Sequence, residues 1–174
     1  SYPTVKGKSE LRDSIARYLK RRFGLDVDPA RHILPVTGTK EGIFTSHLAL
    51  LDPHGTRRGV VVFEPAYPVY VQGARYAGGT VHALTVTRQT GFRPDPESLD
   101  PEMLARTAVM WINYPHNPTG AEADVGWYAR MRELSREHHF ILASDECYAD
   151  VGFGAPHPSV LVPEEAPDFE GVLA

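Results

Sequence analysis

Two short stretches decide the fold of this chain: Asn113-Tyr114-Pro115-His116-Asn117-Pro118-Thr119-Gly120, and further on Asp145-Glu146-Cys147-Tyr148. Apolar runs of strand length precede them, at residues 108–113 and 140–144. Each stretch therefore lies where a buried strand is expected to end. Sheets built from parallel strands bind their ligands at the carboxyl ends of those strands. We therefore expect both stretches to contribute side chains to one site.

Strands and helices alternate along the whole chain, which favours a mostly parallel sheet with helices on both faces. The expected architecture is a three-layer αβα fold. Ser9 is expected to cap the first helix and Gly24 to end it. The pattern predicts strands over residues 32–36, 59–63, 80–86, 108–113 and 140–144. It predicts helices over residues 9–23, 43–51, 69–76, 101–104 and 122–137. The last segment, Gly171-Val172-Leu173-Ala174, is typical of the start of a further buried strand.

The composition indicates one globular unit with enough apolar material for a core, because 42% of the residues are hydrophobic and 23% are charged. The net charge of −4 makes nucleic acid an unsuitable partner. A single cysteine, Cys147, excludes an intrachain disulfide and suits the reducing cytoplasm. No apolar run approaches the ~20 residues that cross a bilayer, and no signal peptide precedes Ser1. We expect a cytoplasmic protein with no membrane partner.

The polar groups at the two strand ends match the needs of pyridoxal 5′-phosphate (PLP). Asp145 follows an apolar run, and a buried carboxylate needs a positively charged partner, which a protonated ring nitrogen supplies. Asn117 lies between two prolines that fix its backbone, so it can donate to the phenolate oxygen of the ring and to a substrate carboxylate. The Tyr148 hydroxyl can reach the same phenolate oxygen. The alternative for Asn117 is a solvated turn residue.

Two segments earlier in the chain add to this set. Thr37-Gly38-Thr39-Lys40 precedes a helix, so the helix N–H groups and the Thr39 hydroxyl can bind a phosphate. The plain alternative for Thr39 is a helix cap. Tyr67 follows the strand at 59–63 and can stack on a flat ring, although Tyr67 and Tyr70 can equally be two core residues.

Two other reactive groups are interpreted as structural. Cys147 lies between acidic residues that do not favour a thiolate, so we expect a small buried residue and not a nucleophile. His138 and His139 could bind a metal ion together with Cys147 or Asp150. Adjacent histidines point in different directions, however, and no third ligand stands at a suitable spacing. No metal site is therefore predicted.

These motifs resemble the class I/II aminotransferases of PLP fold type I, and the resemblance covers essentially the whole chain. It implies a PLP-dependent aminotransferase that acts as a homodimer on amino acids and 2-oxo acids. Within the family the chain is most similar to N-succinyldiaminopimelate aminotransferases of lysine biosynthesis, which implies N-succinyl-L,L-diaminopimelate and 2-oxoglutarate as substrates. The cofactor-binding residues that it implies are Tyr2, which would reach the phosphate in the neighbouring subunit, and Gly38, Thr39, Lys40, Tyr67, Asn117, Asp145 and Tyr148, with Asn117 also binding substrate.

The chain departs from the family pattern in one respect. The Schiff-base lysine is expected about thirty residues after Asp145, but no lysine follows Lys40. We therefore expect that lysine to lie beyond Ala174, so that residues 1–174 contain no catalytic residue. They would be part of the large domain, cut before the lysine, without the small domain and inactive alone. Two other functions stay open: a PLP-dependent lyase with the same cofactor bed, since a fold does not fix a reaction, and a non-catalytic ligand-binding module.

Overall fold

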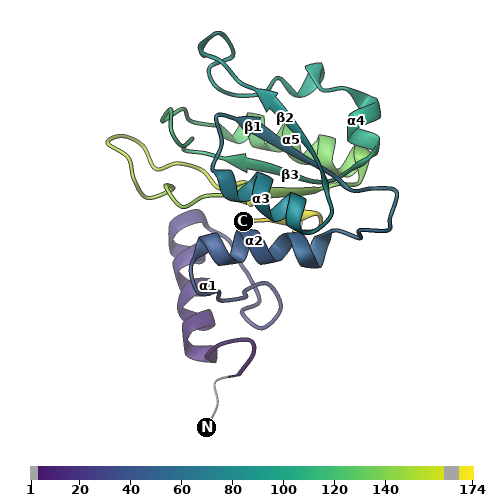
Figure 1. Cartoon of the computed structure of the whole chain (residues 1–174). Coiled ribbons are helices and arrows are strands. Elements are labelled where there is room, and N and C mark those ends of the chain that lie inside the picture. Colours follow the sequence, from purple (N-terminus) through teal and green to yellow (C-terminus); the bar gives the residue numbers. More distant parts are fainter. Residues whose placement is uncertain (1–3, 163–168) are drawn as a thin grey trace.

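The computed structural model describes residues 4–162 and 169–174. Within these residues, five strands form one sheet in the order β2-β1-β3-β4-β5, and every neighbouring pair is parallel. The carboxyl ends of the long strands lie along one edge (Figure 1). The strands are β1 (Gly59–Glu64), β2 (Thr80–Thr85), β3 (Thr107–Asn113), β4 (Ile141–Asp145) and β5 (Val172–Leu173).

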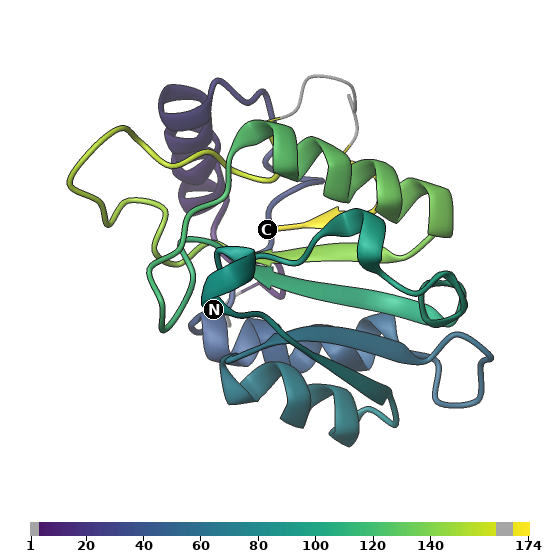
Figure 2. The same ribbon diagram turned by 90° about the horizontal axis from the view of Figure 1, so that it is seen from above.

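Helices cover both faces of this sheet, as expected from the alternation along the chain. Figure 2 shows α2 and α3 on one face and α5 on the other. The helix α1 lies outside these layers and buries none of its residues. The helices are α1 (Ser9–Phe23), α2 (Thr39–Leu50), α3 (Pro68–Tyr76), α4 (Pro101–Ala105) and α5 (Val125–His138), with short 3-10 turns at η1 (Arg88–Thr90) and η2 (Pro96–Ser98).

The core forms two layers because β1 and β3 are apolar on both faces. Val60 and Val62 pack towards α2 and α3, whereas Val61 and Phe63 pack towards α4 and α5. Alternate residues of a strand point to opposite faces, so a continuous apolar run is what a doubly covered parallel strand needs. No helix in the described part of the chain combines the length and apolar character needed to cross a bilayer.

The strand predictions hold to within one residue at each end, with one exception. Residues 32–36 form no strand, and the prediction there was wrong. Pro35 lacks an N–H donor, and none of the five described strands pairs with this segment. Its apolar residues instead belong to the connection between α1 and α2.

The last segment is a strand, as expected, but it is not buried. Val172 and Leu173 form β5 beside β4, whereas Ala174 lies outside the strand and is exposed. Val172 is half-buried and Leu173 is 39% exposed. The expectation of burial over Gly171 to Ala174 was therefore wrong. The reason is position, because β5 occupies the edge of the described sheet and pairs there with β4 alone.

The boundaries of α1 and α5 test the helix ends that were expected from the sequence. Gly24 ends α1 as expected, with φ of 76° and its N–H bonded to the Lys20 carbonyl oxygen at 3.0 Å. Ser9 does not cap this helix, because the cap position is Lys8 and the Ser9 hydroxyl donates to Glu10 Oε2 instead. The helix α5 starts later than expected because the Asp124 side chain accepts the N–H of Trp127.

The strand order creates a topological switch point between β1 and β3. From β1 the chain adds β2 on one side and then β3 on the other. Connections leave in opposite directions at such a switch point, and the gap that opens at the carboxyl ends binds ligands in open α/β sheets. Both decisive stretches of the sequence begin at this edge.

Candidate active site

Asp145, the last residue of β4, provides the buried charge of the site. Its side chain is 9% exposed, as expected for a carboxylate at the end of an apolar strand. The Tyr70 hydroxyl donates to Asp145 Oδ2 at 2.8 Å, and the Cys147 N–H lies 3.3 Å from Oδ1. Within residues 4–162 and 169–174, no lysine, arginine or histidine pairs with Asp145. This carboxylate is held by neutral donors alone.

Tyr70 is a buried residue of α3, and its hydroxyl reaches Asp145 across the sheet edge. Only 3% of Tyr70 is exposed. Burial raises the pKa of Tyr70 far above its ordinary value, and the charge of Asp145 raises it further. The phenol therefore stays protonated and donates its hydrogen to Asp145. The sequence analysis considered Tyr70 only as a possible core residue. Its spacing from Tyr67 places the two side chains on the same face of α3, which was the available signal.

Asn113, which was not predicted as a site residue, joins the two decisive stretches. It lies opposite Asp145 in the register of β3 and β4. Its Nδ2 donates to the Asp145 carbonyl oxygen at 2.7 Å, and its Oδ1 accepts the Asn117 N–H at 2.9 Å. One buried amide thus fixes both Asn117 and the end of β4. The expected convergence of Asn117 and Asp145 at one edge is confirmed.

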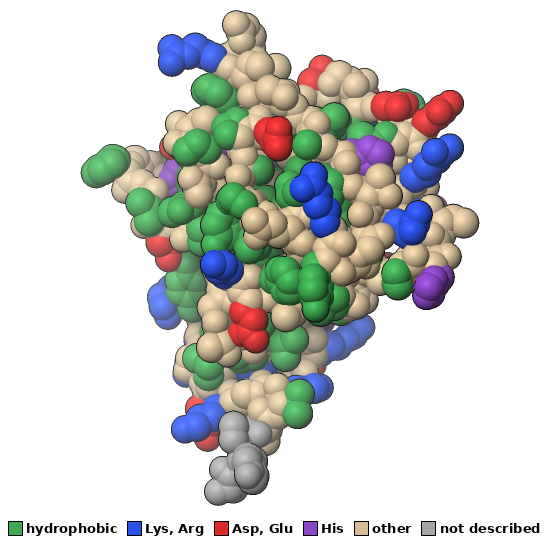
Figure 3. All heavy atoms as spheres, in the orientation of Figure 1, with side chains coloured by type: hydrophobic (Ala, Val, Ile, Leu, Met, Phe, Trp, Pro, Cys, Tyr) green, Lys and Arg blue, Asp and Glu red, His purple; other side chains and the backbone are tan. Residues whose placement is uncertain are grey.

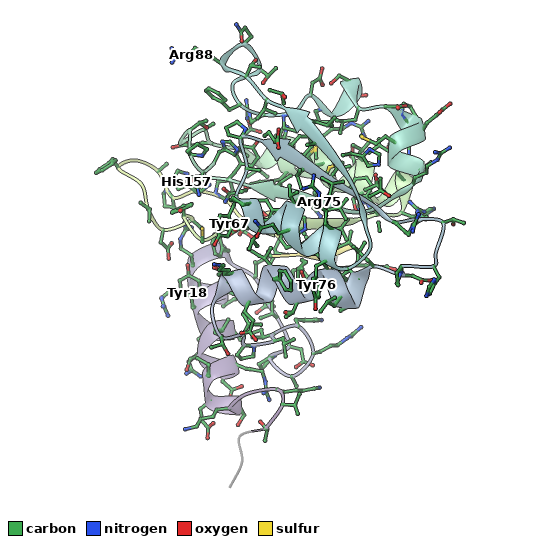
Figure 4. All side chains as sticks on the ribbon, in the orientation of Figure 1. Tyr18, Tyr67, Arg75, Tyr76, Arg88 and His157 are labelled. Atoms are coloured by element: carbon green, nitrogen blue, oxygen red, sulfur yellow. The ribbon has the colours of Figure 1, made fainter. Side chains whose placement is uncertain are left out.

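A shallow hollow lies at this edge and opens to solvent. Phe63 of β1 and Trp111 of β3 line it, which places it at the switch point between these strands. Tyr67 caps the start of α3 and Asn117 is half-buried, and both also line the hollow (Figure 4 labels Tyr67). The Asn117 amide hydrogen-bonds to no residue within the described ranges. An aromatic ring and a free amide therefore face the same space.

The loop that carries Asn117 is braced by His116. The His116 ring is 5% exposed, and its Nδ1 lies 2.7 Å from the Thr119 hydroxyl. Burial lowers the pKa of His116, so the ring is neutral at neutral pH. Sequence reasoning did not single out this histidine, although its position next to Asn117 was a signal.

The turn after β4 carries Tyr148, Cys147 and Glu146. Tyr148 is 39% exposed at the rim of the site. Cys147 is exposed, so the expectation of a buried residue was wrong, because the chain turns outward directly after Asp145. Partial desolvation of the sulfur and the nearby Asp145 charge raise the pKa of the Cys147 thiol to about 11, which disfavours a nucleophilic thiolate. Glu146 points away and accepts the Val160 N–H at 2.7 Å.

The start of α2 is the segment expected to bind a phosphate. Gly38 occupies the cap position with φ of 95°, a left-handed conformation that favours glycine, and no side chain caps the helix. Thr39 is the first helical residue and not the cap, and Thr39 and Lys40 are both exposed. Figures 1 and 2 show that α2 and α3 begin at the same edge of the sheet. Tyr2 lies outside the described residues.

The residues at this edge fit PLP by their chemistry. A buried carboxylate without a cation suits a protonated ring nitrogen, and an aromatic side chain beside the hollow suits the ring. An uncapped helix start suits the phosphate. Among the described residues, no group of three or more His, Cys, Asp or Glu side chains is placed to hold a metal ion. These residues are therefore the candidates for a PLP-binding site in this α/β fold.

Comparison with known proteins gives the family. The family model for aminotransferase class I and II matches residues 1–174, and the chain belongs to this family. Its members depend on PLP. The LL-diaminopimelate aminotransferase of Aquifex aeolicus is 36% identical over 157 residues, which are 90% of this chain and 40% of that protein. That of Natranaerobius thermophilus is 34% identical over 163 residues, 92% of this chain and 41% of that protein.

Solved structures agree with this assignment. Substrate-bound BacF from Bacillus subtilis superposes with a TM-score of 0.88 at 31% identity, covering 92% of this chain and 40% of that one. Aspartate aminotransferase from Thermus thermophilus with maleate gives a TM-score of 0.84 at 31% identity, covering 99% and 43%. The chain thus spans about 40% of the length of the relatives that it matches. The likeness confirms the three-layer αβα fold.

Proposed function

We propose that the protein containing this chain is an aminotransferase that moves an amino group between an amino acid and a 2-oxo acid. The buried Asp145 carboxylate, held by a neutral phenol and left without a cation among the described residues, is the observation that carries the proposal. When bound, PLP supplies an electron sink for the bond cleavage at the amino-acid α-carbon. A carboxylate at the ring nitrogen keeps that nitrogen protonated.

The other residues at the hollow orient the ring and the substrate. Tyr67 stacks on the face of the ring, in keeping with its position on the wall of the hollow. The Asn117 amide donates to the phenolate oxygen and to a substrate carboxylate, and its backbone is held for this by Asn113. Tyr148 donates its hydroxyl to the same phenolate oxygen from the rim. The support for these roles is position and donor type.

The phosphate is held by the segment Gly38, Thr39 and Lys40, where the N–H groups at the start of α2 have no side-chain cap. We propose that Tyr2 adds a hydroxyl to the phosphate of the neighbouring subunit in a homodimer. Exposed apolar side chains on α2 and α3, including Leu48 at 52% and Tyr76 at 73%, give the dimer an apolar surface (Figure 3).

The amino donor belongs to the diaminopimelate class, which would place the enzyme in lysine biosynthesis. The relatives named above are LL-diaminopimelate aminotransferases. We therefore favour the free amino acid, and N-succinyl-L,L-diaminopimelate, expected from the sequence resemblance, is the alternative to compare with it. The acceptor in both cases is 2-oxoglutarate. A reducing, cytoplasmic location suits a chain with one exposed thiol.

Residues 1–174 form part of the large domain in this proposal. The chain matches about 40% of its relatives' length, and no lysine follows Lys40. The lysine that binds the cofactor and moves the proton during transamination then belongs to the remaining part of the enzyme, beyond Ala174. A chain limited to residues 1–174 is expected to show no turnover.

The test compares Asp145→Ala with Asp26→Ala in the full-length protein. Asp26 is an exposed partner of Lys20 on the surface and serves as the control. Transamination is followed with LL-diaminopimelate or its N-succinyl form and 2-oxoglutarate. Asp145→Ala should lower kcat by ~10²-fold or more, because it removes a preorganised charge. Full activity of this variant would refute the role of Asp145, and no turnover by the wild-type protein with any amino donor would refute the function.

A further inference from the structure

A buried histidine of α2 contacts the core beneath the hollow. His47 is fully buried, with 0% of its surface exposed. Its Nδ1 lies 2.8 Å from the Ile43 carbonyl oxygen, one turn earlier in the same helix. Its Nε2 lies 2.9 Å from Trp111 Nε1. Both ring nitrogens are therefore occupied, and neither faces solvent or the hollow.

The partner on β3 fixes the tautomer of His47. An indole N–H can only donate, so Nε2 must accept the hydrogen of Trp111. The remaining hydrogen then lies on Nδ1 and is donated to Ile43. Protonation would place two donors against each other, and burial lowers the pKa of His47. The imidazole is thus a neutral, fixed acceptor for Trp111.

The contacts continue from Trp111 to the carboxylate. The Trp111 and Tyr70 rings are stacked with an interplanar angle of 9° and centroids 5.2 Å apart. The Tyr70 hydroxyl donates to Asp145 Oδ2 at 2.8 Å. Turning the Trp111 indole would move the plane of the Tyr70 ring and with it this hydroxyl. The orientation of the indole is set by its one directional bond, to His47.

The packing around His47 leaves little freedom for a different arrangement. A Cβ atom at Gly73 of α3 would lie 2.6 Å from His47 Nδ1, closer than any real contact. The absence of a side chain at Gly73 is thus what lets α2 and α3 approach with the imidazole between them. The ring is enclosed by Gly73 on one side and by Trp111 on the other, with ring centroids of His47 and Trp111 5.5 Å apart.

We propose that His47 and Trp111 are positioning residues for the cofactor: through Tyr70 they fix the Asp145 carboxylate against the ring nitrogen of PLP. The inference rests on the proposed function. In this proposal, α2 contributes to the cofactor site twice. Its start binds the phosphate, and His47, two turns later, supports the Asp145 carboxylate.

The experiment uses the full-length protein with PLP as the probe. His47→Leu fills a similar volume but offers no acceptor, whereas His47→Gln retains one. Three quantities are measured: the PLP dissociation constant, the ¹⁵N chemical shift of the ring nitrogen in labelled PLP, and the Tm of the PLP-free protein. His54→Leu, in an exposed turn, is the control.

His47→Leu should weaken PLP binding about three- to tenfold, less than the ~10–100-fold typical of a group that directly supports a ligand-binding side chain. The ring-nitrogen shift should move towards the unprotonated form. His47→Gln should stay within about twofold of wild type. Trp111→Phe keeps the stacked ring but loses the N–H, so it should reproduce His47→Leu, and the double variant should be no worse than either single one.

The outcomes separate this inference from the proposed function. A wild-type protein that does not bind PLP would overturn both. Wild-type binding with an unchanged dissociation constant and ring-nitrogen shift in His47→Leu would overturn the positioning role alone, whatever the change in Tm. If His47→Leu does not fold, Trp111→Phe decides, and wild-type values in that variant would overturn the role.

Discussion

Replacing Tyr70 by Phe tests the central contact of the site with the smallest change that the structure allows. The substitution removes one oxygen, which donates to Asp145 Oδ2 at 2.8 Å. The ring and its stacking on Trp111 are retained, so no cavity larger than a hydroxyl forms. Among the described residues, Asp145 then keeps its contacts with Cys147, whose backbone nitrogen lies 3.3 Å from Oδ1.

The expected fall in kcat follows from the charge of Asp145, which accepts the hydrogen bond from Tyr70. A hydrogen bond to a charged group contributes about 1.5–3 kcal/mol. If all of it acts on the transition state, kcat falls roughly 10- to 150-fold, since about 1.4 kcal/mol corresponds to a factor of ten. Tyr70 is buried and lines the hollow, and its hydroxyl contacts Asp145, so its proposed role is in the cofactor site. We therefore expect kcat and kcat/KM to fall together, with KM unchanged.

Steady-state transamination by the full-length protein at saturating PLP provides the measurement. Tyr18→Phe is a matched control, because the Tyr18 hydroxyl of α1 also donates to a carboxylate, Asp150 Oδ2 at 2.6 Å, but in a hydrogen bond that is exposed to solvent. It should behave as wild type. A Tyr70→Phe protein with kcat within twofold of wild type would show that Asp145 does not depend on this hydroxyl. A rise in KM at unchanged kcat would show that Tyr70 acts on substrate binding instead.

Two further substitutions test neighbouring parts of the site. Asn117→Ala should weaken both PLP and substrate binding, about tenfold each, because the amide that faces the hollow is lost while Asn113 still holds the backbone; dissociation constants equal to those of wild type would contradict this. Glu146→Gln tests how the stability of the fold depends on pH. Burial raises the pKa of the Glu146 carboxyl above its unfolded value of 4.5. Its contribution to stability is thus present below pH 4.5 and lost as the pH rises through the folded pKa. The free energy of unfolding of the variant, measured at several pH values, should rise relative to that of wild type by up to ~1.4 kcal/mol per pH unit in that window. Parallel curves for the two proteins would refute this prediction.

The sheet could be predicted from the sequence because each strand is a short apolar run followed by a turn. The strands at 59–63 and 108–113 could be predicted from their own residues alone. The segment 32–36 looked similar but forms no strand. Whether a short apolar run becomes a strand depends on whether a partner strand lies beside it, and that partner can be far away in the sequence.

The positions of Tyr67, Asn117 and Asp145 at or near the ends of strands could be predicted from the sequence, while their roles at a cofactor remain predictions. The contacts that hold those residues could not be predicted from the sequence. Tyr70 and Asp145 are 75 positions apart, and only the strand order, with β3 between β1 and β4, brings α3 over the end of β4. Asn113 was missed for the same reason, because its partners depend on the register between β3 and β4.

The way in which Asp145 is held suits its proposed role at the ring nitrogen of PLP. An arginine or lysine beside the carboxylate would stabilise it in the free protein, since an unpaired buried charge costs several kcal/mol. That cation would also compete with the ring nitrogen for the same oxygens. Tyr70 orients the carboxylate without neutralising it. If Asp145 faces the ring nitrogen of PLP as proposed, the place of a cationic partner is left for the cofactor, and a local rule of stability is broken where function needs it to be.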